Sequence, residues 1–327
     1  MRKKMILMAF ALFIGLSACG NDDKELTGKP GNEQGGNGGG APDNPGDPSG
    51  SEPVSWYVAT TGNDANSGTV ESPLKSISKA LLRVNPGDTI FLREGAYHEF
   101  VTPTRSGKKG KLVTVKSYPG ETAKIDGTGL TIKGWFSALV QLKSIQYMTF
   151  ENLHICNATN SDVNTDPEGV YINGVSRDIT FRNCKVYNIK STCLAGHNNG
   201  DWRSAHAFLV IGDDNGTPIR NLTIEKCEIY DIHTGTSETL TIAGNVDGFT
   251  IQDCEVHDVE NIGIIVAGGD NLNAGGDISV NYARNGVVRR NRVYRCSHQV
   301  SKDFWEGVYN NPAAYGAIGI YVCGGAS

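Results

Sequence analysis

Two short phrases of hydrophobic and polar residues recur over the C-terminal two thirds of the chain. The first alternates apolar and polar positions, and its copies are Met148–Cys156, Ile179–Tyr187, Leu222–Tyr230, Phe249–His257 and Gly286–Tyr294. The second is an aliphatic run that ends at Gly, with copies Val170–Gly174, Phe208–Gly212, Leu240–Gly244, Ile264–Gly268 and Ile320–Gly324. Alternation with a period of two predicts strands, and helical periodicity is absent from 130–327.

Each repeat therefore predicts a strand, a Gly turn and a second strand. The shortest repeat is 24 residues, from Gly244 to Gly268. Two or three short strands per repeat of this length are typical of a parallel β-helix, whose coils stack about 4.8 Å apart. Equivalent residues of successive coils should form ladders. We expect one inward ladder to contain Leu153, Cys184, Cys227, Cys254 and Asn291.

Charged residues of the first phrase test this alignment. One outward column should contain Glu151, Arg182, Glu225, Gln252 and Arg289, and the next His154, Lys185, Glu228, Glu255 and Arg292. Opposite charges mostly become neighbours, as expected for cross-strand pairs on a solvated sheet face. This pattern favours Arg289 and Arg292 as ladder partners and not as ligand clamps.

The segment before the repeats carries a recognisable opening. Trp56–Thr69, Ser72–Leu81 and Pro86–Glu99 predict a strand, a Gly/Asn turn, a short amphipathic helix (with Leu74 on its apolar face) and a second strand. Such a helix would cap the open hydrophobic end of the solenoid. With the repeats, 54–327 closely resembles secreted proteins of the pectate-lyase-like superfamily. The resemblance implies an all-β fold, a right-handed parallel β-helix with an N-terminal capping helix.

The N-terminus has a different composition. Arg2–Lys4 is basic, Met5–Gly15 is apolar but too short to span a bilayer, and Leu16–Cys19 resembles the lipobox of bacterial lipoproteins. This resemblance implies a signal peptide at 1–18, a lipidated Cys19 and a flexible Gly/Pro/Asn-rich tether at 19–53. The acidic run Asn21–Glu25 looks like the tether of Bacteroidetes-type surface lipoproteins. It implies an outer-membrane lipid anchor, with the protein surface-exposed or facing the periplasm. The alternative is an ordinary secretory signal with a chance Cys.

Composition and charge limit the function classes. The chain of 327 residues has 39% hydrophobic and 20% charged residues, which is ordinary globular composition. Its net charge of −5 argues against a dedicated nucleic-acid binder. Besides Cys19 there are seven Cys with no C-x-x-C pair, so we expect buried thiols and no disulfide framework or zinc site. We expect a monomer.

The resemblance also implies a chemistry. Pectate-lyase-like relatives cleave acidic polysaccharides by β-elimination, which needs a cation, commonly calcium, and a base, often Arg or Lys. Asp247-Gly248-Phe249 matches the start of a phrase that leads to a catalytic Lys in calcium-dependent relatives, but Ile251-Gln252-Asp253 follows here. The calcium and Lys of those relatives therefore do not transfer to these positions.

Two clusters are candidates for chemistry within the repeats. Asp213 and Asp214 directly follow a strand, where they could bind calcium or simply form a polar turn. Alignment of the strands also places Glu168, His206 and Glu238 in one column on consecutive coils. Such a carboxylate–His–carboxylate row can orient a general base, and the alternative is a hydrogen-bond ladder that lines a turn.

Two insertions supply the remaining candidates. We expect 270–285 and 297–315 to emerge from the same end of neighbouring strands and to form a binding face. Arg284 and Lys302 are the predicted base or carboxylate clamp, and the predicted substrate contacts are Tyr282, Trp305, Tyr315 and Asn311. Alternatively, these loops only cover the outward apolar residues Leu209, Ile211 and Ile265.

Three function classes follow from these patterns. The first is a lyase of an acidic, uronate-containing polysaccharide. The others are a non-catalytic glycan-binding or surface-structural β-helix, and a glycoside hydrolase with two carboxylates and no calcium. Gly319–Gly325 repeats the second phrase without the partner strand that follows it elsewhere. We therefore expect 54–327 to be truncated within the solenoid, which could remove part of an active groove.

Overall fold

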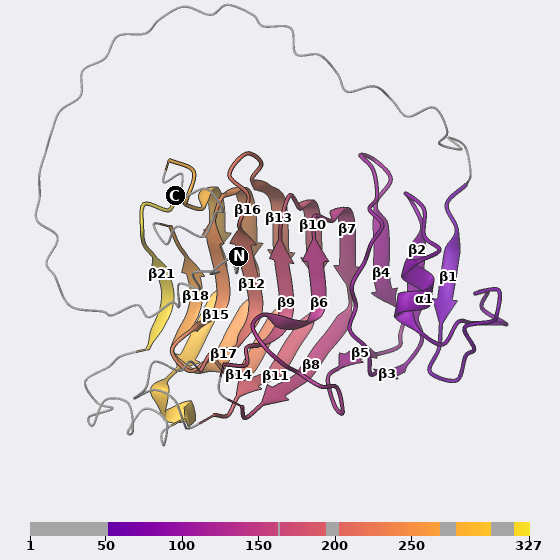
Figure 1. Cartoon of the computed structure of the whole chain (residues 1–327), viewed down its shortest axis with the longest axis horizontal. Coiled ribbons are helices and arrows are strands. Elements are labelled where there is room, and N and C mark those ends of the chain that lie inside the picture. The colour runs from indigo at the N-terminus through magenta and orange to yellow at the C-terminus, as the bar shows by residue number, and fades with distance from the viewer. Residues whose placement is uncertain (1–51, 163, 194–202, 269–278, 302–316) are drawn as a thin grey trace, which may run out of the picture. The chain divides into compact units, whose positions relative to one another are not determined.

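The computed structural model describes residues 52–162, 164–193, 203–268, 279–301 and 317–327 (Figure 1). The signal peptide, Cys19 and the tether predicted for the N-terminus lie outside these residues. Pro53–Ser327 contributes to one compact unit. In the part of the chain that is described, no helix has the length and hydrophobicity of a membrane span.

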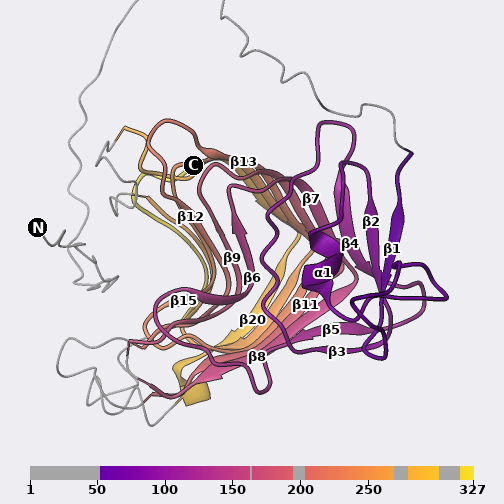
Figure 2. The same cartoon turned by 45° about the vertical axis from the view of Figure 1, so that its right-hand side comes forward.

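Three parallel sheets run side by side along the solenoid (Figures 1 and 2). Sheet A contains β1 (Ser55–Val58), β2 (Thr89–Leu92), β4 (Val113–Ser117), β7 (Gln146–Glu151), β10 (Arg177–Arg182), β13 (Ile219–Glu225), β16 (Val246–Gln252) and β19 (Arg284–Arg289). Sheet B contains β3 (Gly95–Tyr97), β5 (Ala123–Asp126), β8 (Leu153–Asn160), β11 (Lys185–Ser191), β14 (Glu228–His233), β17 (Glu255–Val259) and β20 (Arg292–Cys296). Sheet C contains β6 (Ser137–Lys143), β9 (Pro167–Asn173), β12 (His206–Gly212), β15 (Glu238–Gly244), β18 (Ile262–Val266) and β21 (Ile318–Val322).

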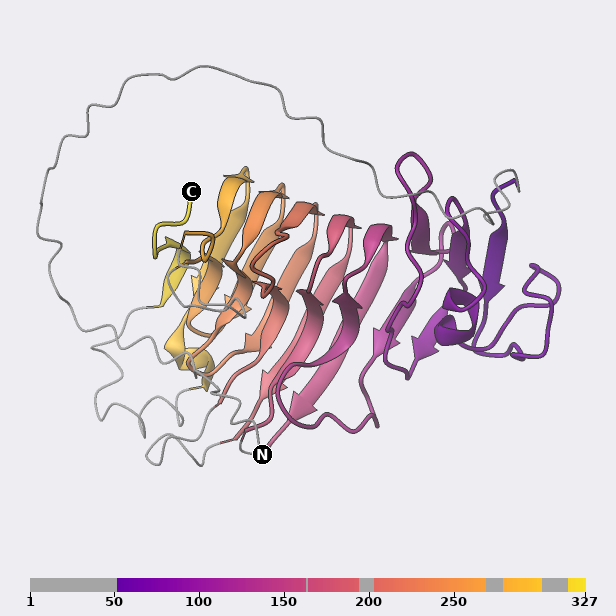
Figure 3. The same ribbon diagram turned by 45° about the horizontal axis from the view of Figure 1, so that its top comes forward.

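From β4 onward the chain passes through sheets A, B and C in turn, so each coil lies on the preceding one (Figure 3). The register is the one that the two phrases predict. Phe208 pairs with Val170 on one side and with Leu240 on the other, and Leu222 pairs with Ile179 and Phe249. The predicted parallel β-helix is therefore confirmed.

The interior contains the expected ladder. Cys184, Cys227 and Cys254 are at most 2% exposed, and their thiols are free. Asn291 is only partly buried. At the end of the ladder its side chain forms hydrogen bonds to the neighbouring backbone: Oδ1 accepts from the Cys254 N–H at 2.9 Å, and Nδ2 donates to Ile251 O at 2.9 Å.

The outward columns pair as predicted. Arg182 Nε lies 2.6 Å from Glu225 Oε1, and Lys185 Nζ lies 2.6 Å from Glu228 Oε2. Arg289 donates to Gln252, and Arg292 pairs with Glu255 at 3.2 Å. Both arginines are therefore ladder partners. The corner between sheets A and B needs a left-handed residue, which Asn and Asp tolerate better than most. Its φ is between 52° and 56° at Asn152, Asn183, Lys226, Asp253 and Arg290.

The opening phrase forms the expected N-terminal cap. Helix α1 (Ile77–Leu81) buries Ile77, Ala80 and Leu81, and Ser76 caps its N-terminus. The predicted helix included Leu74, but this residue instead forms a parallel bridge with Val58. The helix begins later because the Glu99 carboxylate accepts from the Ile77 and Ser78 backbone N–H groups and so fixes its first turn.

The last coil differs from the interior coils. Ile320 and Val322 of β21 are 46% and 55% exposed, whereas their register partners Ile264 and Val266 are 0% and 3% exposed. The two inward columns therefore reach solvent here. The predicted domain limits, including the truncation, stay predictions.

Candidate functional site

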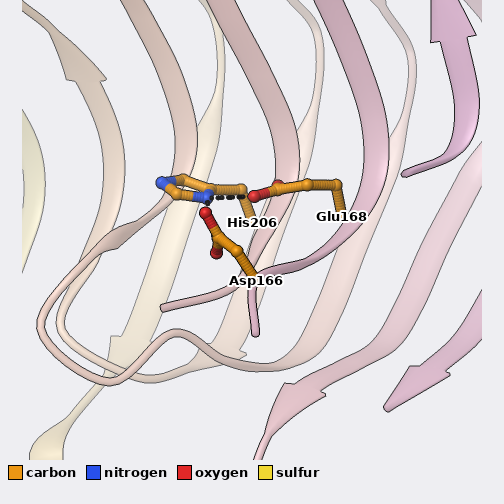
Figure 4. A group of neighbouring side chains, drawn as sticks. All are labelled: Asp166, Glu168 and His206. Carbon is orange, nitrogen blue, oxygen red and sulfur yellow. Dashed lines mark hydrogen bonds and ion pairs between the residues drawn. The ribbon is translucent and has the colours of Figure 1, made fainter. Parts of the chain in front are cut away.

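A row of ionisable side chains lies where the strands of sheet C begin (Figure 4). His206 pairs in register with Glu168, and its Nδ1 lies 2.9 Å from Glu168 Oε1. On the other side, His206 Nε2 lies 3.8 Å from Glu238 Oε2. Ala207 belongs to the hydrophobic core, so the preceding residue, His206, points to the opposite face of the strand. The predicted carboxylate–His–carboxylate column is thus present.

Asp166 joins this row and was not among the predicted residues. Its Oδ1 lies 4.0 Å from His206 Nδ1, on the same nitrogen as Glu168 (Figure 4). Asp166 precedes β9 by one residue, so it lies outside the strand that the alignment of coils brings into register. The signal that could have found it is the spacing Asp166-Pro167-Glu168, because side chains two apart in an extended chain share a face.

Burial dominates the electrostatics of the row. Asp166, Glu168 and His206 are 2%, 0% and 5% exposed. Burial raises the pKa of Glu168 well above its usual range, and burial together with the neighbouring Glu168 raises that of Asp166. Asp166 Oδ1 and Glu168 Oε2 accept no hydrogen bond in the described part of the protein. At neutral pH these carboxyl groups therefore need either protons or a cation.

Glu238 is the most exposed member of the row, with 10% of its side chain accessible. Thr241 Oγ1 lies 3.4 Å from Glu238 Oε2, the oxygen that also faces His206. His206 and Thr241 therefore both contact the Oε2 atom of Glu238. Glu238 is consequently the row member best placed to touch a bound molecule.

A buried ion pair fixes the adjoining corners between sheets B and C. Arg203 Nη2 lies 3.2 Å from Glu260 Oε2, and the same oxygen accepts from the Gly235 N–H at 2.8 Å. Arg203 Nε also donates to Ser191 O at 2.8 Å. These bonds join corners on three coils and restrain the backbone three residues before His206. Sequence patterns did not indicate this pair, because its members lie in unequal loops.

The predicted calcium residues have turn contacts. The Asp213 carboxylate accepts from the Gly174 N–H at 2.8 Å and from Asn173 Nδ2 at 3.1 Å. Asp214 Oδ1 accepts from the Gly216 and Thr217 backbone N–H groups. These bonds support the alternative of a polar turn.

The two insertions leave sheet C at opposite ends, which corrects the expectation of a shared end. Residues 267–283 follow the carboxyl end of β18, whereas 297–317 lead into the amino end of β21. Arg284 is at the first of these ends, where it contacts Asn245 Oδ1 at 3.0 Å and Asp247 Oδ2 at 3.5 Å. The six steps from Glu238 to Gly244 along β15 separate the two ends by about 20 Å.

The remaining predicted contacts are distributed as follows. The Arg284 guanidinium lies over the Tyr282 ring in a cation–π contact, with 5.5 Å between Arg284 Cζ and the ring centroid. Leu209, Ile211 and Ile265 are 3–5% exposed, so these outward apolar residues are covered. The other predicted residues lie outside the described residues: Lys302, Trp305, Asn311 and Tyr315.

Residues 56–262, which include the whole row, match the model of the Pel9A-like right-handed beta helix region. The chain belongs to this family. The uncharacterised protein YwoF of Bacillus subtilis is 31% identical over 230 residues, which are 70% of this chain and 46% of that protein. Pectate lyase PEL9 of Emericella nidulans is 29% identical over 142 residues, 39% of this chain and 33% of the lyase.

A solved structure shares the fold at lower identity. The GH136 lacto-N-biosidase of Eubacterium ramulus superposes with a TM-score of 0.60 and 18% identity, over 84% of this chain and 50% of the biosidase. The chain thus spans about half or less of these relatives. Proteins with different activities share the β-helix, so the reaction must be argued from the site.

Proposed function

We propose that the protein is a polysaccharide lyase that cleaves an acidic, uronate-containing chain by β-elimination at the row described above. The observation that carries the proposal is the Glu168–His206–Glu238 arrangement, which lies inside the segment that matches the Pel9A-like family. A pectate lyase among the relatives supports a uronate substrate.

Glu238 is the proposed base. In β-elimination a base removes the proton at C5, the C4–O bond breaks, a C4=C5 double bond forms, and the departing oxygen takes a proton. Glu238 Oε2 faces His206 Nε2 and Thr241 Oγ1, so Oε1 is the oxygen that we assign to accept the C5 proton. Glu168 holds the opposite nitrogen of His206 and so keeps the ring in place.

The calcium of the wider superfamily does not fit this row. Calcium takes six to eight oxygen ligands, whereas the side chains whose ligand atoms converge, Asp166, Glu168 and His206, offer two carboxylates and an imidazole nitrogen. We therefore assign calcium no step here. Because the row is acidic, a uronate also needs a basic partner. Arg284 and Lys302 stay the predicted partners, although Arg284 is bound to Asn245 and Asp247 at the other end of sheet C.

A glycoside hydrolase is the second candidate, and one observation favours it. Burial raises the pKa of Asp166 and Glu168, and a carboxyl group that stays protonated near neutral pH is what a general acid needs. A hydrolase acting on a neutral glycan would not need the basic partner.

Product analysis separates these candidates. The full chain is incubated with pectin, rhamnogalacturonan, alginate, glycosaminoglycans and neutral glycans, and both new reducing ends and ultraviolet absorbance of unsaturated uronides are measured. A lyase forms both together, whereas a hydrolase forms reducing ends alone. Binding without either product would favour the non-catalytic glycan-binding class.

Two matched variants locate the activity. Glu238→Gln should lower kcat about 10²–10⁴-fold while the melting temperature stays close to that of the wild type. Glu255→Gln makes the same chemical change on sheet B, in the outward charge ladder, and should keep full activity. Full activity of Glu238→Gln would overturn the proposed site.

A further inference from the structure

Two buried carboxylates and one imidazole nitrogen converge at the start of sheet C. The ligand atoms of Asp166, Glu168 and His206 lie within 4.8 Å of one another (Figure 4). We propose that these three residues bind a divalent first-row transition-metal ion such as Zn²⁺ or Mn²⁺, and that Glu238 supports the imidazole from its other side.

The spacing of the three side chains suits such an ion. Around a metal with bonds of about 2.0–2.2 Å, neighbouring ligand atoms are about 3.0–3.5 Å apart. His206 Nδ1 lies 2.9 Å from Glu168 Oε1 and 4.0 Å from Asp166 Oδ1, so the observed separations bracket this range. Small side-chain rotations would bring all three to one centre. The ion would take the place of the hydrogen bond between His206 Nδ1 and Glu168 Oε1.

Unpaired lone pairs point to a cation independently of this spacing. Asp166 Oδ1 is directed at the imidazole, and it accepts no hydrogen bond within the described residues although the residue is 98% buried. Glu168 Oε2 is in the same situation in a fully buried side chain. The two carboxyl groups are close enough to hydrogen-bond to each other when one of them is protonated, and a cation would take the place of that proton. Buried acceptors without donors are costly, and two carboxylates balance the charge of one divalent ion.

The donor set selects the class of metal. Imidazole favours zinc, iron, copper and nickel, whereas carboxylates also suit manganese, and a mixed site suits ions between these extremes. Three protein ligands leave one or more positions for water or a substrate oxygen. Calcium would need several more oxygen ligands than these side chains supply.

Glu238 completes the arrangement. Histidine ligands of metals usually donate their second ring N–H to a carboxylate, which fixes the tautomer and the ring orientation. His206 Nε2 faces Glu238 Oε2 at 3.8 Å, and this contact would shorten if Nδ1 bound the metal. Glu238 is therefore proposed as a positioning residue for the metal, a role independent of its proposed part in lysis.

Metal binding can be measured without any substrate. The full chain is stripped with a chelator and then titrated with Zn²⁺, Mn²⁺ and Ca²⁺ by calorimetry, and bound metal is counted by elemental mass spectrometry. We expect one equivalent of Zn²⁺ or Mn²⁺ with an affinity at least about tenfold above that for Ca²⁺. Co²⁺ in the same site should show visible absorption bands that shift when His206 is replaced by Gln.

Variants assign the ligands and separate this proposal from the lyase proposal. Glu168→Gln and His206→Gln should each lower metal affinity more than tenfold, and Glu238→Gln by about 10–100-fold. Asp213→Asn, at the alternative acidic turn, and Glu255→Gln, on sheet B, should bind as the wild type does. Circular dichroism checks that each variant is folded. If a variant does not fold, the Co²⁺ spectrum of the wild type still tests whether a histidine nitrogen binds the metal.

Three results would overturn the metal site: no bound ion, calcium bound as tightly as zinc and manganese, or unchanged affinity in folded Glu168→Gln and His206→Gln. A protein that binds metal but cleaves no polysaccharide would overturn only the proposed reaction. A protein that cleaves uronates but binds neither Zn²⁺ nor Mn²⁺ on titration would overturn only the metal site.

Discussion

Cys227 offers a direct test of the inward ladder. The residue is 2% exposed, and its Sγ lies 3.7 Å from Phe181 O and 3.4 Å from Glu225 O. Cys184 and Cys254 occupy the equivalent positions on neighbouring coils and are also buried. We predict that Cys227→Asp lowers the free energy of unfolding by about 5–7 kcal/mol at neutral pH.

The magnitude follows from the two carbonyl oxygens. They repel a carboxylate, so the new side chain must hold a proton, and this costs about 4 kcal/mol at pH 7 because an unfolded Asp has a pKa of about 3.9. The neutral carboxyl can donate one hydrogen bond to a carbonyl, but its second oxygen stays without a donor, at about 1–3 kcal/mol. The total is a large part of the about 5–15 kcal/mol that stabilises a typical domain.

Urea unfolding followed by circular dichroism measures this effect. Cys227→Ser is the matched control, because its hydroxyl can donate to the same carbonyl, and it should cost only about 1–2 kcal/mol. The difference in the free energy of unfolding between Cys227→Asp and Cys227→Ser should shrink by about 2.7 kcal/mol from pH 7 to pH 5, because protonating the buried Asp costs less at the lower pH. If Cys227→Asp unfolds within about 1 kcal/mol of the wild type, the thiol is not in the core and the register is refuted.

Three further predictions concern single positions. Burial raises the pKa of both Glu168 and Asp166, so the metal-free wild type should lose stability as the pH rises from the ordinary pKa of a carboxyl group through these raised values. Glu168→Gln keeps only the contribution of Asp166 and should lose less stability over the same pH range. Urea midpoints that shift equally with pH in both proteins would contradict the raised pKa. Arg284→Ala should keep activity if Glu238 is the base and Lys302 is the basic partner of the uronate, and a loss of activity in the folded variant would favour the predicted role of Arg284. Cys19→Ala should move the protein from the membrane to the soluble fraction, and unchanged retention would count against lipidation.

The ladders of this β-helix could be predicted from sequence because they are nearest-neighbour features. Each strand pairs only with the equivalent strands of the coils beside it, so alignment of two phrases fixes which strand residues become neighbours. The pairing of Phe208 with Val170 and Leu240, and the ion pair of Arg182 with Glu225, follow from that alignment alone. The column of Glu168, His206 and Glu238 was found in the same way.

Only the tertiary structure showed the burial and the fourth member of this row. Asp166 lies outside the repeated strand, so no alignment places it beside His206, and its 2% exposure depends on how the corner folds. The Arg203–Glu260 pair joins residues 57 apart through corners of unequal length. Which end of sheet C an insertion leaves from is likewise set by the order in which the chain passes through the three sheets. Periodicity determines the regular strands, whereas the corners have no period, and the proposed site lies at the corners.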